Sequence, residues 1–210
     1  ASCRERARAG IAALRTEVLR FGGFGWHEGK FGWSAEGFVP KGTPMGRSAL
    51  EAIRGRLGVQ NVCTVGAPVI TTVGFHLALM VRPMGWSGHR MMGLNGEPPK
   101  DGLLMSAAFA EAYVEHFRGA HFRLLRRLAR EARLIVVPPP PMTTEPNIAR
   151  IRALVIDRIR QMGIEVYDPM TELLADEPGF PARFVGDDPS HATADYGELV
   201  MAGLRAAGKI

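Results

Sequence analysis

With 210 residues, 46% of them hydrophobic and 22% charged, and a net charge of +5, the chain has the composition of a soluble globular protein with one large core. No apolar run approaches the roughly 18 residues of a membrane span, the Arg-rich N-terminus lacks the apolar centre of a secretory signal, and Cys3 and Cys63 have neither disulfide-framework nor metal-ligand spacing. We therefore expect a single domain over residues 1–210, in the cytoplasm, with reduced thiols and no membrane span.

The N-terminal part is expected to hold two helices separated by a long loop. Apolar positions recur at helical spacing over residues 5–19, and Ser2 stands just ahead of them, where an N-cap belongs. Residues 21–47 contain eight glycines, a density that defeats a regular helix, so we expect a loop that holds at most a short strand. Its aromatic side chains, Trp33 among them, either pack against the protein's own core or stack on sugar rings of a ligand. A second helix is predicted over residues 48–57.

The next segment predicts buried strand structure followed by a second loop. A strand, or a pair of strands, is expected over residues 59–73, which are rich in valine. It ends at Gly74-Phe75-His76, where the lone histidine is either a core residue satisfied by backbone groups or a hydrogen-bond donor in a site. Glycine and proline punctuate residues 82–102, which predicts a loop, and Trp86 within it suits a lid or a substrate wall.

Two helices are expected next, over residues 103–117 and 120–132. The second one carries a row of positive charges on one face: Arg123, Arg126, Arg127 and Arg130. No aromatic residues are interleaved with these arginines, which favours a solvated face over a site for nucleic acid or another anionic polymer. We therefore expect no nucleic-acid partner.

The C-terminal half alternates strands and helices. A short apolar strand, residues 134–137, runs into four prolines that cannot continue a sheet. A helix over residues 145–162 returns the chain to another strand, residues 164–167. This alternation predicts a mostly parallel sheet with right-handed crossovers. Open α/β sheets bind their ligands at the carboxyl ends of the strands, which is the edge where the prolines leave the sheet.

A carboxylate and an imidazole stand three residues apart in Asp188-Pro189-Ser190-His191, shortly before a predicted C-terminal helix. One interpretation is a turn and N-cap leading into that helix, because Asp, Pro and Ser are ordinary turn residues. The other is a catalytic pair, in which the carboxylate keeps one ring nitrogen protonated and aims the imidazole at a nucleophile.

The pattern Asp188-x-x-His191, followed by Ala192-Thr193-Ala194-Asp195-Tyr196-Gly197 and a closing helix, resembles the C-terminal signature of the SGNH/GDSL hydrolase superfamily. The resemblance extends upstream through the segment Gly163 to Pro169 and the strand that ends in prolines, and it covers roughly the last 80 residues. It implies a three-layer α/β/α sandwich with a mostly parallel sheet.

The resemblance also implies a triad in which Asp188 and His191 act with a serine near the N-terminus. In that superfamily the serine lies at a strand-to-helix junction, usually within Gly-Asp-Ser, and Ser2 is the matching residue. The residues before Ser2 depart from that motif, and the family's first strand would precede Ala1. Cys3, one residue out of place, is the weaker candidate.

An oxyanion hole is implied as well. Its donors would be the backbone N–H groups of Ser2 and of a glycine in the segment Gly42 to Gly46, with Gly46 the candidate, and the side chain of His76, which stands where the family has asparagine. Three aromatic residues are expected to contact the substrate: Trp33, Phe75 and Trp86.

The implied function is hydrolysis of an acyl ester, or transfer of its acyl group, through a covalent acyl-enzyme. The substrate would be a small molecule or an O-acylated carbohydrate, and the chemistry needs neither a cofactor nor a metal. A second interpretation stays open: a non-catalytic member of the same fold that binds carbohydrate or serves as an accessory protein in polysaccharide modification. The missing Gly-Asp-Ser motif and His76 favour it. The sequence does not determine the oligomeric state.

Overall fold

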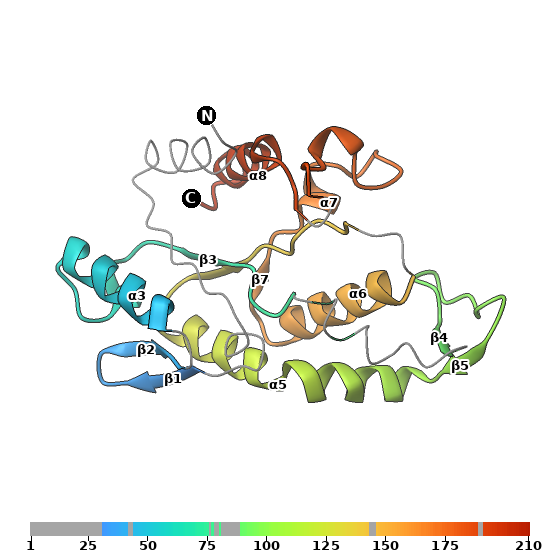
Figure 1. Cartoon of the computed structure of the whole chain (residues 1–210), viewed down its shortest axis with the longest axis horizontal. Helices are drawn as coiled ribbons and strands as arrows, with labels where there is room; N and C mark the ends of the chain where they lie inside the picture. The colour runs from blue at the N-terminus through green and yellow to red at the C-terminus, as the bar shows by residue number, and fades with distance from the viewer. Residues whose placement is uncertain are drawn as a thin grey trace. The chain divides into compact units, whose positions relative to one another are not determined.

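The computed structural model describes residues 31–41, 44–75, 77, 80, 89–142, 146–188 and 191–210 (Figure 1). The chain divides into two compact units, a first unit of Ala1–Val69 with Tyr167–Ile210 and a second unit of Ile70–Val166. None of the helices within the described ranges is long and apolar enough to cross a membrane.

A mostly parallel sheet of three strands, in the order β3-β6-β7, forms the centre of the second unit. The fully buried β6 (Leu134–Val136) pairs in parallel with β7 (Glu165–Val166). On the other side of β6 lies β3 (Val69–Thr71), and just past β6 the N–H of Val137 donates to the carbonyl of Thr71 over 2.9 Å. The predicted α/β class with a mostly parallel sheet is therefore confirmed.

Two helices pack side by side in the second unit. α5 (Ala107–Glu131) contacts β6 and α6 (Pro146–Gln161) contacts β7. In Figure 1, α6 runs above α5. Removing apolar side chains from water is the main favourable term in folding, and this unit does so between the helices and the sheet. Its fully buried side chains include Phe122, Leu125, Ile135, Ile151, Val155 and Ile159.

The structure corrects the prediction of two helices over residues 103–117 and 120–132, because α5 is continuous through Gly119. A glycine inside a helix costs only about 1 kcal/mol. Buried side chains continue on both sides of it, with Val114 before and Phe122 after on the core side of the helix, and their burial outweighs that cost. The helix also begins later than predicted, where the hydroxyl of Ser106 accepts the N–H of Phe109 over 3.2 Å as an N-cap.

Two short strands lie where a loop and a helix start were predicted. β4 (His89–Met91) and β5 (Leu103–Met105) pair in parallel as a separate two-stranded sheet. The buried side chain of Asn147, near the start of α6, accepts the N–H of Met91 over 3.1 Å. This hydrogen bond satisfies a backbone group at the end of β4 and ties the small sheet to α6.

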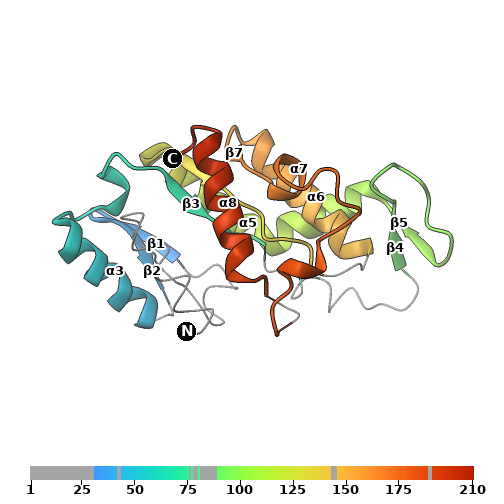
Figure 2. The same ribbon diagram turned by 90° about the horizontal axis from the view of Figure 1, so that it is seen from above.

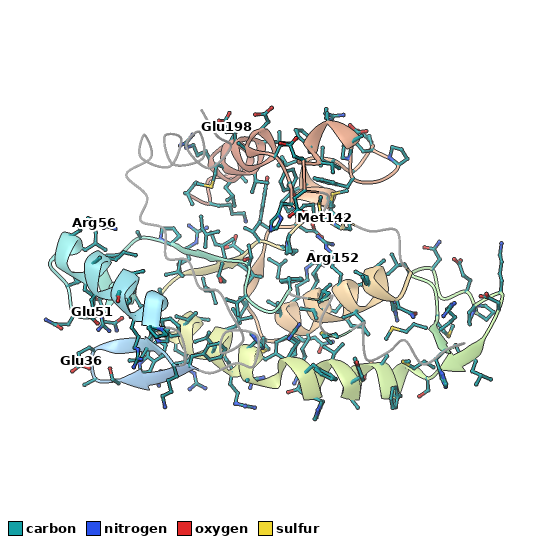
Figure 3. All side chains as sticks on the ribbon, viewed as in Figure 1. Glu36, Glu51, Arg56, Met142, Arg152 and Glu198 are labelled. Carbon is teal, nitrogen blue, oxygen red and sulfur yellow. The ribbon has the colours of Figure 1, made fainter. Side chains whose placement is uncertain are left out.

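The prolines after β6 carry the chain out of the sheet, as predicted. Pro138 is fully buried, and the carbonyl of Pro139 accepts a hydrogen bond from Nε of Arg152 over 3.3 Å. Arg152 is labelled on α6 in Figure 3. The side chain thus binds the departing segment to the helix that follows it.

In the first unit, residues 31–40 form an antiparallel hairpin inside the predicted loop 21–47. β1 (Phe31–Ser34) and β2 (Gly37–Pro40) are joined by a two-residue turn, and Gly37 has a φ of +93°, which favours glycine. Trp33 lies opposite Phe38, with ring centroids 6.5 Å apart. This cross-strand aromatic pair supplies packing that stabilises the hairpin.

The helix expected over residues 48–57 begins four residues earlier, since α3 spans Pro44–Leu57. Proline suits the first position of a helix because its N–H would have no partner there. The prediction of a strand over residues 59–73 is wrong for most of that segment. It forms a 3₁₀ helix, η1 (Val62–Thr64), before β3 begins.

The C-terminal part of the first unit consists of α7 (Pro169–Glu172), the 3₁₀ helix η2 (Ala182–Phe184) and α8 (Ala194–Ala206), which packs against both. The approach is closest at Gly203 of α8. A Cβ atom added there would overlap the hydroxyl of Tyr167 and lie 2.8 Å from both terminal methyl groups of Leu173. Only glycine therefore fits this position without movement of its neighbours.

We expect Gly203→Ala to lower the free energy of unfolding by about 1–3 kcal/mol, because overpacking forces neighbouring side chains or the helix to shift. Urea unfolding followed by circular dichroism measures the change. Gly197→Ala, on the same helix, is the matched control, since a Cβ there meets nothing within 4 Å. It should raise the stability by roughly 0.5–1 kcal/mol, because alanine favours the helix. Equal effects in both variants would contradict the packing argument.

Candidate active site

The predicted pair lies on a loop that is closed by backbone hydrogen bonds. The N–H of Thr193 donates to the carbonyl of Phe184 over 2.8 Å, and the N–H of Gly186 donates to the carbonyl of His191 over 2.9 Å. Inside the loop the N–H of His191 donates to the carbonyl of Asp188 over 3.0 Å. These bonds hold the two sides of the loop together.

The loop is anchored at both ends. On one side it leaves η2, and on the other it enters α8, drawn in red in Figure 2. The hydroxyl of Thr193 caps α8 by accepting the N–H of Tyr196 over 3.4 Å. The ring of Tyr196 lies edge-on to Phe180 at 5.1 Å and tilted against Phe184 at 5.7 Å. This aromatic cluster gives the loop a packed base.

The side chains of Asp188 and His191 meet across the turn, with Nδ1 of the imidazole 2.7 Å from Oδ2 of the carboxylate. An ionised carboxylate only accepts hydrogen bonds, so the proton belongs on Nδ1. Nε2, on the opposite side of the ring, is then left with a lone pair. The His191 side chain is 77% exposed and that of Asp188 59%, so the pair is open to a solute.

The loop is a turn, as one interpretation predicted, but the N-cap of α8 is Thr193 and not a residue of the Asp-Pro-Ser segment. The carboxylate of Asp188 is instead hydrogen-bonded to the imidazole of His191. The arrangement can take a proton at Nε2 and stabilise the resulting imidazolium through Asp188, which is the chemistry of a general base with an orienting partner.

Some of the other predicted site residues lie in the first unit and one lies in the second. The rest lie outside the described ranges. Gly46 and Trp33 belong to the first unit, as the pair does. Gly46 is a buried residue in the first turn of α3, where a backbone N–H has no partner within the helix. Trp33 is half-buried in β1. Phe75 is buried and belongs to the second unit.

Ser2, His76 and Trp86 lie outside the described residues, as does Cys3. Asp188 and His191 are thus the two predicted site residues that a hydrogen bond is seen to bring together. No group of three or more His, Cys, Asp or Glu side chains suited to a metal ion occurs within the described ranges.

Two residues that shape the loop had no predicted role. Gly186 faces the backbone of His191 so closely that an added Cβ would lie 2.9 Å from its carbonyl oxygen. Thr193 caps the helix that carries the loop. Two features of the sequence could have indicated these roles. They are a glycine shortly before the Asp-x-x-His pattern, and a Thr three residues before Tyr196, at the start of an amphipathic run.

Searches against known proteins add no identification: no protein-family model, curated protein or solved structure matches this chain. The interpretation of the site therefore depends on its residues and their geometry.

Proposed function

We propose that the chain is a serine esterase or acyltransferase of the SGNH/GDSL type that acts on acyl esters. The observation that supports it most is the 2.7 Å contact between Nδ1 of His191 and Oδ2 of Asp188 on a loop leading into the last helix. In this proposal the parallel sheet belongs to the three-layer α/β/α sandwich of that superfamily.

The proposed reaction begins when Nε2 of His191 takes the proton of the Ser2 hydroxyl and the serine oxygen attacks the acyl carbon. The electron pair of the carbonyl moves onto its oxygen, where the N–H groups of Ser2 and Gly46 and the side chain of His76 would stabilise the charge. The intermediate collapses, the ester bond breaks, and the leaving alkoxide takes the proton from His191. Asp188 stabilises the transient imidazolium.

The second half of the reaction repeats these proton transfers with a new nucleophile. His191 removes a proton from water or from an acceptor hydroxyl, which attacks the acyl-enzyme and releases Ser2. Water gives a hydrolase and an acceptor hydroxyl gives an acyltransferase. Trp33, Phe75 and Trp86 would contact the substrate, and their flat apolar faces suit an O-acylated carbohydrate.

Active-site labelling tests the proposal. We expect a fluorophosphonate to label the protein at Ser2, as found by peptide mapping, and the labelling to disappear in His191→Ala because the serine is no longer activated. The protein should be expressed with any residues that its gene encodes ahead of Ala1. A folded protein that remains unlabelled contradicts the triad, and the non-catalytic, carbohydrate-binding interpretation then explains the chain better.

A second test uses the close approach of Gly186 to His191. In Gly186→Ala the new methyl group meets the His191 carbonyl oxygen, so the turn must open and the imidazole must move. We expect turnover of an activated ester to fall by on the order of 10–100-fold, because misplacing a catalytic group by about 1 Å has effects of this size.

Steady-state kinetics measures the change, with Gly179→Ala as the matched control, because a Cβ at residue 179 meets nothing within 4 Å. Wild-type turnover in Gly186→Ala would show that the backbone position of His191 does not matter for the reaction.

A further inference from the structure

A second feature of the molecule lies in the second unit, where positive charge is concentrated. Residues 118–161 contain 10 arginines and three acidic residues, a net charge of +7 (10 − 3). The whole chain has a net charge of +5, so the remainder carries −2 (5 − 7). The basic character of the protein therefore comes from the C-terminal half of α5, α6 and the segment between them.

Four of these arginines form an exposed surface on the C-terminal half of α5, termed here the arginine face: Arg123, Arg126, Arg127 and Arg130. The opposite side of the helix is buried in the core, through Phe122, Leu125 and Leu128 among others. Like charges three or four residues apart on a helix repel one another. The arginine face therefore destabilises its own helix unless negative charge compensates it.

The described residues supply only part of that compensation. Arg127 pairs with Glu131 over 2.9 Å. Nearby carboxylates are used by other arginines, since Glu115 pairs with Arg158 over 3.2 Å. Among the residues that the structure describes, no carboxylate lies within ion-pair distance of Arg123, Arg126 or Arg130. Within the part of the chain that the structure describes, three exposed guanidinium groups on two helical turns thus have no carboxylate as an ion-pair partner.

We propose that the arginine face binds an anionic polysaccharide through its carboxylate or sulfate groups. A guanidinium presents paired N–H donors that match the oxygens of such groups. With a rise of 1.5 Å per residue, the row from Arg123 to Arg130 is about 10 Å long, which suits anionic groups repeated along a polymer better than one small anion.

The same surface fits other anionic macromolecules less well. Single-stranded nucleic acid is bound by aromatic rings on which bases stack, and the arginine face contains none. A helix that lies on a membrane inserts an apolar face, and that of α5 is already buried. This inference goes beyond the proposed function, because binding of a polymer does not depend on ester chemistry.

Binding to defined polymers tests the inference. We expect fluorescence anisotropy to show binding of labelled heparin or polygalacturonate, with no binding of neutral dextran. The affinity should fall steeply as salt rises, because each contact releases counterions. The triple variant Arg123→Gln, Arg126→Gln and Arg130→Gln should bind on the order of 10–100-fold more weakly at about 0.15 M salt. Preference for one polymer identifies sulfate or carboxylate as the recognised group.

The matched control removes the same charge elsewhere, at exposed arginines of the first unit: Arg47→Gln, Arg183→Gln and Arg205→Gln. Circular dichroism checks that both triple variants are folded. The inference is overturned if neither polymer binds, or if both triple variants lose affinity equally, which would make net charge the cause. It is also overturned if duplex DNA or anionic phospholipid vesicles bind more tightly through the arginine face. None of these measurements uses an ester. Their outcome therefore does not depend on whether the proposed ester hydrolysis is found.

Discussion

His191→Ala is expected to lower the turnover of a small activated ester such as p-nitrophenyl acetate by on the order of 10⁴–10⁶-fold, because loss of the proposed general base would leave the proposed serine nucleophile protonated. The stability should hardly change. The His191 side chain is 77% exposed, and its imidazole is hydrogen-bonded to Asp188. Initial rates and a thermal melt on the same preparation measure both quantities.

His116→Ala is the matched control for this prediction, since His116 is an exposed histidine on α5, outside the loop. It should retain wild-type turnover. If His191→Ala retains activity as well, the pair is not the catalytic base, and any esterase activity of the preparation comes from another site.

Asp188→Asn is expected to lower turnover by on the order of 10⁴-fold while the side chain keeps its shape. An amide can donate its N–H to Nδ1, which moves the imidazole proton to Nε2. The nitrogen that should accept the serine proton is then already protonated. The rate constant for turnover should therefore fall far more than the Michaelis constant changes.

The neighbouring carboxylate offers a close control. Asp187 is exposed on the same turn and carries the same charge, but it makes no hydrogen bond to another described residue. Asp187→Asn should remain within a few-fold of the wild type, because its exposed charge is screened by water and salt. Similar losses in both variants would mean that Asp188 acts through charge alone and not through its hydrogen bond to His191.

Local patterns in the sequence were sufficient for several elements. The helices α6 and α8 and the strand β6 lie close to their predicted positions. In each, apolar residues recur at the period of the element within a short window, and that period reflects contact with a core. The approach of Asp188 and His191 was also predictable, because the two residues share one short turn.

Local patterns did not predict elements that pair with a segment farther along the chain. They also failed where two local conformations have similar energies. The β1–β2 hairpin formed inside a glycine-rich segment because Trp33 and Phe38 pair across it. The β4–β5 pair joins short strands separated by a long connection. Propensity alone does not disclose such pairing, since strand stability depends on the neighbour that each strand finds.

Local sequence patterns were enough to predict the α/β class, the alternation that makes the sheet mostly parallel, and the carboxylate and imidazole placed three residues apart before the last helix. The folded structure was needed to establish that Thr193 caps α8, which leaves Asp188 to bind the imidazole, and that α5 continues through Gly119 as one helix. The physical reason is the same in both cases. Each outcome is a competition between local alternatives of about 1 kcal/mol, and packing against the rest of the fold exceeds that difference.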